Sequence, residues 1–170
     1  MATIEIVKAV SEADFCAVAN LLRAFDVWRN ERYRDDEGLV AGYDDQKAWE
    51  TELNQLSRLY AGQGRAMLLG YLDGLPAGCV ALREFAPGIS EMKRMFVSDA
   101  ARGKGLGRAL AVAVIDRARE MGFHTMRLET GYKQVEAETL YRQLGFRAID
   151  AYAEYPQDVA QKTVFMEKQL

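Results

Sequence analysis

Apolar residues recur every three or four positions in several stretches of this chain, which is the spacing of one helix face. The first stretch follows Ser11 and Asp14, a residue pair typical of a helix start, and the third begins at Leu106. Four helices are therefore predicted, with apolar faces formed by Phe15, Val18, Ala19, Leu22 and Phe25; by Trp49, Leu53, Leu56 and Tyr60; by Leu106, Leu110, Val114, Ala118 and Met121; and by Ala137, Leu140, Tyr141 and Leu144.

Short apolar runs rich in β-branched residues predict strands between these helices. Asp73-Gly74 between two such runs indicates a hairpin, and the polar stretch 30–44 predicts a long loop or a broken helix. The final connection, which contains Pro156, is expected to join the last two strands. The predicted strands cover 3–7, 65–71, 77–84, 91–97, 125–130, 146–152 and 162–168.

The resulting element order is β-α-α-β-β-β-α-β-α-β-β, in which antiparallel strands come first and strand–helix units follow. This order predicts an α/β fold with a mixed sheet of about seven strands and helices on both faces. The chain has 170 residues, 49% of them apolar, and no internal repeat or linker, so one domain over 1–170 is expected.

The N-terminus lacks a basic segment followed by an apolar core, and no apolar run approaches the length of a membrane span. A cytoplasmic protein without a membrane partner is therefore expected.

Cys16 and Cys79 fall in apolar elements and are expected to be buried, reduced thiols rather than a catalytic pair. The single histidine, His124, is expected to lie in a surface loop.

A glycine-rich loop with three cations stands between the strand at 91–97 and the helix that begins at Leu106. Its sequence is Arg102-Gly103-Lys104-Gly105-Leu106-Gly107-Arg108. Glycines let backbone N–H groups approach an anion closely, and a helix N-terminus adds unsatisfied donors and partial positive charge. The loop fits neither the dinucleotide nor the nucleoside triphosphate pattern, yet it predicts a phosphate cradle.

The loop matches R/Q-x-x-G-x-G/A after a Glu-x-Lys-Arg-Met-Phe-Val strand, and Ala137-x-x-Leu140-Tyr141-x-x-x-Gly145-Phe146 follows downstream. In these motifs, which span 91–146, the chain resembles the GNAT superfamily of acetyl-CoA-dependent N-acetyltransferases. The resemblance implies acetyl-CoA as acyl donor and no metal. It implies a cofactor site formed by Met95, Phe96, Val97, Arg102, Gly103, Lys104, Gly105, Leu106, Gly107, Arg108, Gln134, Ala137 and Tyr141.

The resemblance also implies catalytic roles. Tyr141 would lie near the thioester sulfur as the acid, although its helical spacing also fits a core tyrosine. Glu91 is the first candidate for the base, with Glu129 or a water chain as alternatives. A backbone N–H near Phe96 or Val97 would bind the thioester oxygen. Gln134 stands where the family often has asparagine, so its contact to the cofactor is expected to differ.

The acceptor carries no motif. Residues 31–52 hold eight acidic side chains against three basic ones, which favours a small molecule with a primary amine. Trp28, Tyr33, Tyr43, Tyr152 and Tyr155 are candidate pocket residues. A net charge of −3 argues against a nucleic-acid partner. A non-catalytic acyl-CoA sensor of the same fold remains an alternative, and a homodimer is one option left open.

Overall fold

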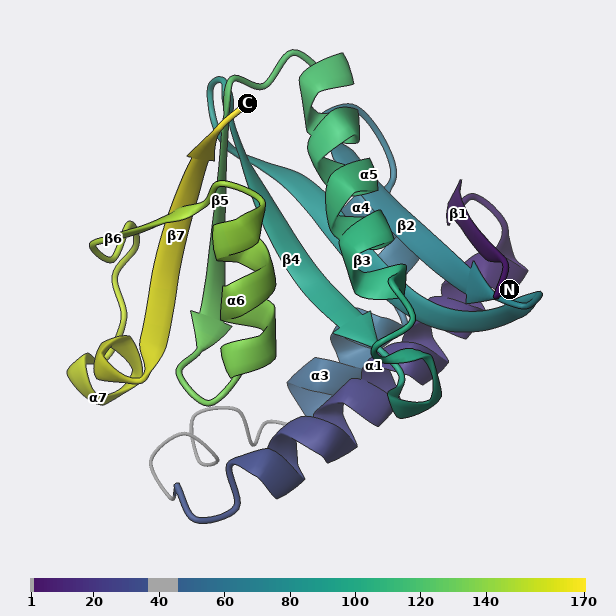
Figure 1. The fold of residues 1–170 in the computed structure, drawn as a ribbon, viewed down its shortest axis with the longest axis horizontal. Coiled ribbons are helices and arrows are strands. Elements are labelled where there is room, and N and C mark those ends of the chain that lie inside the picture. Colours follow the sequence, from purple (N-terminus) through teal and green to yellow (C-terminus); the bar gives the residue numbers. More distant parts are fainter. Residues whose placement is uncertain (1, 37–45) are drawn as a thin grey trace.

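The chain folds around one seven-stranded mixed sheet in the order β1-β2-β3-β4-β5-β7-β6 (Figure 1). The computed structural model describes residues 2–36 and 46–170. Only β4 and β5 pair in parallel, and the other neighbours are antiparallel. The strands are β1 (Ile4–Lys8), β2 (Arg65–Leu72), β3 (Leu75–Ala86), β4 (Ile89–Val97), β5 (Thr125–Gly131), β6 (Arg147–Ile149) and β7 (Thr163–Gln169).

Helices cover both faces of this sheet, as the element order predicts. On one face α5 and α6 pack on a core that includes Leu106, Leu110 and Met92, and on the other α1 packs on a core that includes Leu22, Leu69 and Phe96. The described helices are α1 (Glu12–Arg32), α3 (Gln46–Leu53), α4 (Leu56–Tyr60), α5 (Leu106–Glu120), α6 (Val135–Gln143) and α7 (Gln157–Gln161), with a 3-10 turn η1 at Asp99–Ala101.

Two local predictions are confirmed in detail. Ser11 and Asp14 form a reciprocal capping box at the start of α1. The β2–β3 hairpin turns at Asp73 and Gly74, which adopt φ angles of 51° and 79°. Two consecutive positive φ values match the twist of the flanking strands, and Asp-Gly is suited to this turn.

Other boundaries differ from the prediction. α1 continues to Arg32, two residues beyond the predicted start of the loop, and the second helix is broken into α3 and α4 around Asn54. Asparagine favours turns because its side chain competes for backbone hydrogen bonds. Cys16 is exposed, so the expectation that both cysteines are buried is wrong for Cys16 and confirmed for Cys79.

The C-terminal region also departs from the prediction. β6 has three residues instead of the seven predicted at 146–152, because the chain leaves the sheet edge after Ile149 and brings the Tyr152 hydroxyl to Glu91. α7 was not predicted. It starts directly after Pro156, a position where a fixed φ is compatible with a helix start.

β4 and β5 separate along their length, and this separation positions the site. Their recorded pairing runs from Ile89–Thr125 to Met92–Leu128 and stops there, whereas β4 stays paired with β3 as far as Val97. Arg94 lies at an irregularity of that β3–β4 pairing with a φ of 55°. The last residues of β4 therefore present an edge that β5 does not occupy.

The Asp36 carboxylate links the segment after α1 to residues on the far side of the gap between β4 and β5. Its carboxylate accepts hydrogen bonds from Lys162 at 2.6 Å and from the Tyr132 hydroxyl, and Lys133 Nζ lies 3.4 Å away. These contacts, Lys162 foremost, lower the pKa of Asp36 from 3.8 to about 2. The ionised form is therefore favoured in the folded protein, and its contribution to stability is present above pH 3.8.

We expect the stability difference between wild type and Asp36→Asn to be constant near neutral pH, to shrink as the pH falls below about 4, and to disappear only below about pH 2. Urea unfolding between pH 2 and 7 measures it. Asp35→Asn, at the exposed neighbouring carboxylate, is the matched control and should show no such trend. A wild-type to Asp36→Asn difference that stays constant down to pH 2 would contradict the assignment.

Within the described residues, no helix is both long and apolar enough to cross a membrane.

Candidate active site

The N-terminus of α5 forms a backbone cradle. Gly103 and Gly105 adopt φ angles of 73° and 89°, a region that L side chains rarely adopt. Gly105 is the N-cap and offers no side-chain cap, and the first recorded intrahelical bond is donated by Ala109. The N–H groups at the start of α5 thus have no recorded protein acceptor among the described residues, which suits a phosphate.

A cleft of about 350 Å³ leads from this cradle to Tyr141. Its walls come from β4, the glycine-rich loop, α6 and α1. All of the predicted cofactor residues except Lys104 and Leu106 line it. The Leu106 side chain is completely buried in the core, so only its backbone remains for an anion, and Lys104 is exposed. A side-chain contact to a cofactor is therefore not expected for Leu106, and the contact predicted for Lys104 stays a prediction.

From the sequence, Trp28 is predicted only as a candidate acceptor-pocket residue, and the lining of the cofactor cleft by α1 is not predicted. Trp28 lies between two guanidinium groups, those of Arg32 and Arg102, each 4.8 Å from its ring centroid. Arg32 also donates to Glu136 of α6 at 2.8 and 2.9 Å. Phe25, one turn earlier, lines the same cleft. The helical spacing of Phe25, Trp28 and Arg32 was visible in the sequence, but nothing in it indicated which partner this face meets.

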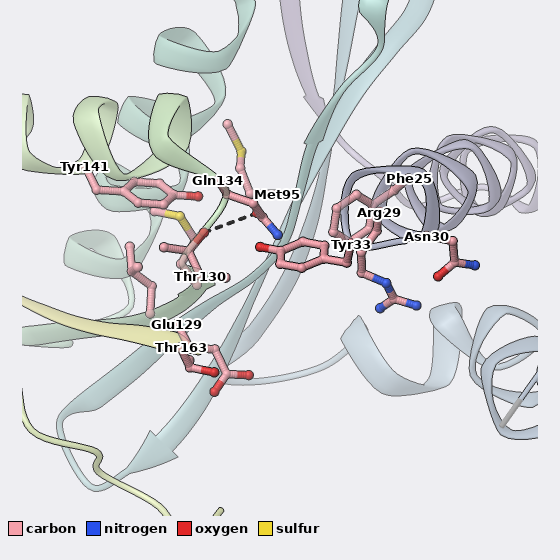
Figure 2. A pocket seen from close by; sticks show the side chains of 13 residues that line it. Phe25, Arg29, Asn30, Tyr33, Met95, Glu129, Thr130, Gln134, Tyr141 and Thr163 are labelled. Atoms are coloured by element: carbon pink, nitrogen blue, oxygen red, sulfur yellow. Dashed lines mark hydrogen bonds between the residues drawn. The ribbon is translucent and has the colours of Figure 1, made fainter. Parts of the chain in front are cut away.

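A second, smaller chamber of about 120 Å³ lies next to the cleft (Figure 2). The two cavities share Phe25, Met95, Gln134 and Tyr141. Further chamber residues come from α1 and its C-cap, β4, β5 and the start of β7. They are Arg29, Asn30, Tyr33, Met92, Leu128, Glu129, Thr130, Gly131 and Thr163.

Gly131 is the position where tight packing requires glycine. A Cβ added there would lie 2.0 Å from the Tyr33 hydroxyl, which also accepts a hydrogen bond from the Lys133 N–H at 3.3 Å. Next to it, Thr130 donates to the Gln134 amide oxygen at 3.2 Å, drawn as a dashed line in Figure 2. Gln134 is thereby held at the boundary between cleft and chamber.

Tyr141 lies at the junction of the two cavities. Its ring is 5% exposed and packs edge-on against Phe146, with 5.8 Å between centroids. No hydrogen bond to its hydroxyl is recorded among the described residues, and Figure 2 shows the hydroxyl directed toward the cavity. Burial raises the pKa of Tyr141 well above 10.0, so the phenol keeps its proton at neutral pH and can donate a hydrogen bond.

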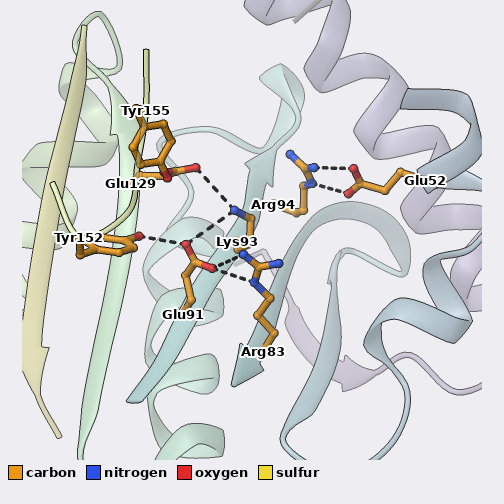
Figure 3. A network of polar contacts seen from close by, with 8 residues as sticks. All are labelled: Glu52, Arg83, Glu91, Lys93, Arg94, Glu129, Tyr152 and Tyr155. Carbon is orange, nitrogen blue, oxygen red and sulfur yellow. Dashed lines mark hydrogen bonds and ion pairs between the residues drawn. The ribbon is translucent and has the colours of Figure 1, made fainter. Parts of the chain in front are cut away.

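The two candidate carboxylates lie in one polar network on the sheet face opposite α5 (Figure 3). Lys93 Nζ lies 3.7 Å from Glu91 Oε1 and 3.5 Å from Glu129 Oε1. Glu91 is 1% exposed and accepts hydrogen bonds from Arg83 at 2.7 Å and Tyr152 at 2.9 Å. Glu91 and Lys93 therefore point to the same side, as strand alternation predicts.

Only Glu129 of these two carboxylates lines the chamber. Tyr155 donates a hydrogen bond to it from the segment between β6 and α7. Glu91 lies outside both sets of lining residues, so its role as base stays a prediction. Tyr152 and Tyr155, expected only as pocket aromatics, hold the carboxylates instead.

Three carboxylates of the acidic region 31–52 are paired with cationic side chains in the fold. Asp36 is bound by Lys162, Glu50 by Arg23 at 3.0 Å and Glu52 by Arg94 at 2.6 Å.

The candidate Tyr43, like residues 37–45 as a whole, lies outside the described residues. Among residues 2–36 and 46–170, no cluster of His, Cys, Asp or Glu has the arrangement of a metal site. His124 is exposed, as expected.

This combination of a split sheet, a glycine-rich helix start and a cleft ending at a buried tyrosine defines the class of acyl-CoA-binding transferases. A family model described as the acetyltransferase (GNAT) family matches residues 22–146. The chain belongs to this family, which confirms the family, the fold and the acyltransferase class predicted from the sequence.

The chain is also similar to individual proteins of this family. It is 38% identical over 104 residues to IAA acetyltransferase of Azospirillum brasilense, covering 61% of this chain and 67% of that protein. It is 36% identical over 104 residues to the uncharacterized N-acetyltransferase YjgM of Escherichia coli, covering 59% of this chain and 62% of that protein. The match thus spans about two thirds of the length of these curated relatives.

Solved structures share the fold over nearly the whole chain. The PaiA N-acetyltransferase of Thermoplasma acidophilum, solved with coenzyme A, superposes with a TM-score of 0.74 at 20% identity, covering 99% of each chain. A GNAT acetyltransferase of Staphylococcus aureus Mu50 gives 0.73 at 20% identity, covering 98% of this chain and 99% of the other. At this level of identity the similarity establishes the fold alone.

Proposed function

We propose that this chain transfers the acetyl group of acetyl-CoA to the primary amine of a small molecule by direct attack. One observation carries the proposal: the cleft that begins at the α5 cradle and the separate chamber meet at Tyr141. A donor bound in the cleft would present its thioester at that junction, and an acceptor in the chamber would approach from the other side. Such positioning removes much of the entropic cost of joining two reactants.

Each step of the transfer has a candidate group. Acetyl-CoA, as acyl donor, supplies a thioester carbon that a neutral amine can attack. The uncapped amides of α5 and the cations of the loop suit its pyrophosphate. A main-chain N–H near Phe96 or Val97, on the β4 edge that β5 leaves unpaired, suits the thioester oxygen as it gains negative charge.

The proton balance assigns roles to two side chains. As the C–N bond forms and the C–S bond breaks, one amine proton must leave and the thiolate must gain one. We assign the first role to Glu129, the second candidate of the sequence analysis, because it lines the chamber and Glu91 does not; it would accept the proton directly or through water. The Tyr141 phenol is the donor placed to stabilise and protonate the thiolate.

Calorimetry with acetyl-CoA and coenzyme A, followed by a thiol-release assay with a panel of amines, tests this function. We expect saturable binding and amine-dependent release of free thiol. Gly105→Ala should weaken binding about 10-fold, because alanine disfavours a φ of 89° by about 1–2 kcal/mol and the free loop would relax away from the conformation that presents its N–H groups. Tight binding without any thiol release would instead support the alternative, a non-catalytic acyl-CoA sensor.

A further inference from the structure

The chamber contains two charged side chains among its described lining residues, and they come from opposite walls. Arg29 belongs to α1 and Glu129 to β5. Figure 2 shows them on different sides of the space that Tyr33 and Thr130 border. Any acceptor that fills this chamber therefore lies between a cationic and an anionic group.

Arg29 is held rigidly at its end of the chamber. Its guanidinium is ion-paired with Asp26 one turn earlier on α1, and both side chains are 12% exposed. The guanidinium carbon also lies 5.8 Å from the ring centroids of Phe25 and Trp49. Its orientation is thus fixed before any acceptor binds, which lowers the entropic cost of using it for recognition.

The polar groups nearest to Arg29 in sequence extend this wall. Asn30 follows it directly, Tyr33 lies one helical turn further on, and both line the chamber. A guanidinium has N–H donors in a planar fork that matches a carboxylate, and the Asn30 amide adds one more donor group. The Tyr33 hydroxyl lies at the other side, against Gly131 and the Lys133 N–H. This end of the chamber is therefore built to receive an oxyanion.

The opposite end suits an ammonium or amine. Glu129 is held by Tyr155 and lies 3.5 Å from Lys93, and the hydroxyl of Thr163 lines the chamber with it. Each charged end has a recorded counter-ion, Asp26 for Arg29 and Lys93 for Glu129. A ligand with separated charges of both signs keeps this balance, whereas a simple cation or anion leaves a half-buried charge uncompensated.

We infer that the acceptor is a zwitterionic amine of the amino-acid type, whose carboxylate binds Arg29 and whose amino group faces Glu129 and the thioester. This inference rests on the proposed transfer and adds its substrate class. It restricts the class of small amines expected from the acidic region 31–52 to those that also carry a negative charge. Arg29 is then a specificity-determining residue.

Matched acceptors test this directly. We compare amino acids with the corresponding amino-acid amides and decarboxylated amines, and measure kcat/KM by thiol release at saturating acetyl-CoA. We expect the carboxylate-bearing member of at least one matched set to be preferred about 10- to 100-fold, the range of a charged hydrogen-bonded contact. Equal or better turnover of every uncharged analogue would overturn the inference while leaving the transfer itself intact.

Substitution of Arg29 provides a second test of the inferred acceptor class. Arg29→Met should raise KM for the preferred acid about 10- to 100-fold and erase the preference over its amide. Arg29→Met alone leaves the buried Asp26 carboxylate without this partner and could destabilise the fold. The double variant Asp26→Asn/Arg29→Met removes both charges, and we expect it to show the same change in acceptor preference as the single variant. Arg23→Met, on the same helix but 44% exposed and paired with Glu50, is the control and should change nothing.

The outcomes separate the two proposals. If Arg29→Met lowers kcat/KM equally for acids and their amides while coenzyme A affinity is kept, Arg29 has no role in specificity and the inference is overturned. If no amine of any class releases thiol although acetyl-CoA binds, the proposed transfer falls and this inference falls with it.

Discussion

A Tyr141→Phe variant is expected to lose about 100-fold in kcat while it keeps the wild-type Kd for coenzyme A. The substitution removes one hydroxyl and retains the ring that packs 5.8 Å from Phe146. That hydroxyl has no recorded hydrogen bond within the described part of the chain and is directed toward the cavity. Its loss should therefore cost little stability and act on the departure of the thiolate.

Turnover by thiol release, binding by calorimetry and thermal unfolding separate these effects. Tyr71→Phe is the matched control, because Tyr71 packs at the edge of the other core and lines neither cavity. Wild-type turnover in Tyr141→Phe would remove the acid role. A parallel fall in coenzyme A affinity would assign Tyr141 to binding instead.

Glu129→Gln is expected to lower kcat/KM for the amine by about 100-fold near neutral pH, because glutamine cannot accept the amine proton. The side chain keeps its size and its place beside Tyr155 and Lys93. The measurement is thiol release over a range of pH. The deficit should narrow at high pH, where more of the free amine is already deprotonated.

Glu91→Gln distinguishes the two carboxylates. Glu91 is 1% exposed and bound to Arg83 and Tyr152, so we expect its loss to lower the free energy of unfolding by about 1–3 kcal/mol. A much larger fall in kcat/KM for Glu91→Gln than for Glu129→Gln would reverse the assignment and restore Glu91 as the base. Comparable losses would indicate that the network linked by Lys93 acts as one unit.

The sequence alone determined the features that depend on neighbouring residues. The capping box at Ser11, the hairpin at Asp73-Gly74 and the start of α5 at Leu106 all lie where the local pattern predicts them. These elements depend on apolar periodicity and on glycine conformations, both of which act over a few residues. The apolar pattern also predicted the order of the main elements, whereas the end of the β4–β5 pairing at Met92 and Leu128 was found only in the structure.

Only the tertiary structure decided which side chains share a cavity. Glu91 and Glu129 are equivalent in the sequence as strand carboxylates, yet Glu129 alone of the two lines the chamber. The sequence does not indicate which partner is met by the helix surface that carries Trp28, Arg29 and Arg32. In the fold, α1 packs beside β4 and α6, and this packing brings Arg32 to Glu136. Arg32 and Glu136 are 104 positions apart in the sequence. Such contacts follow from how helices and strands pack in space, which local spacing does not encode.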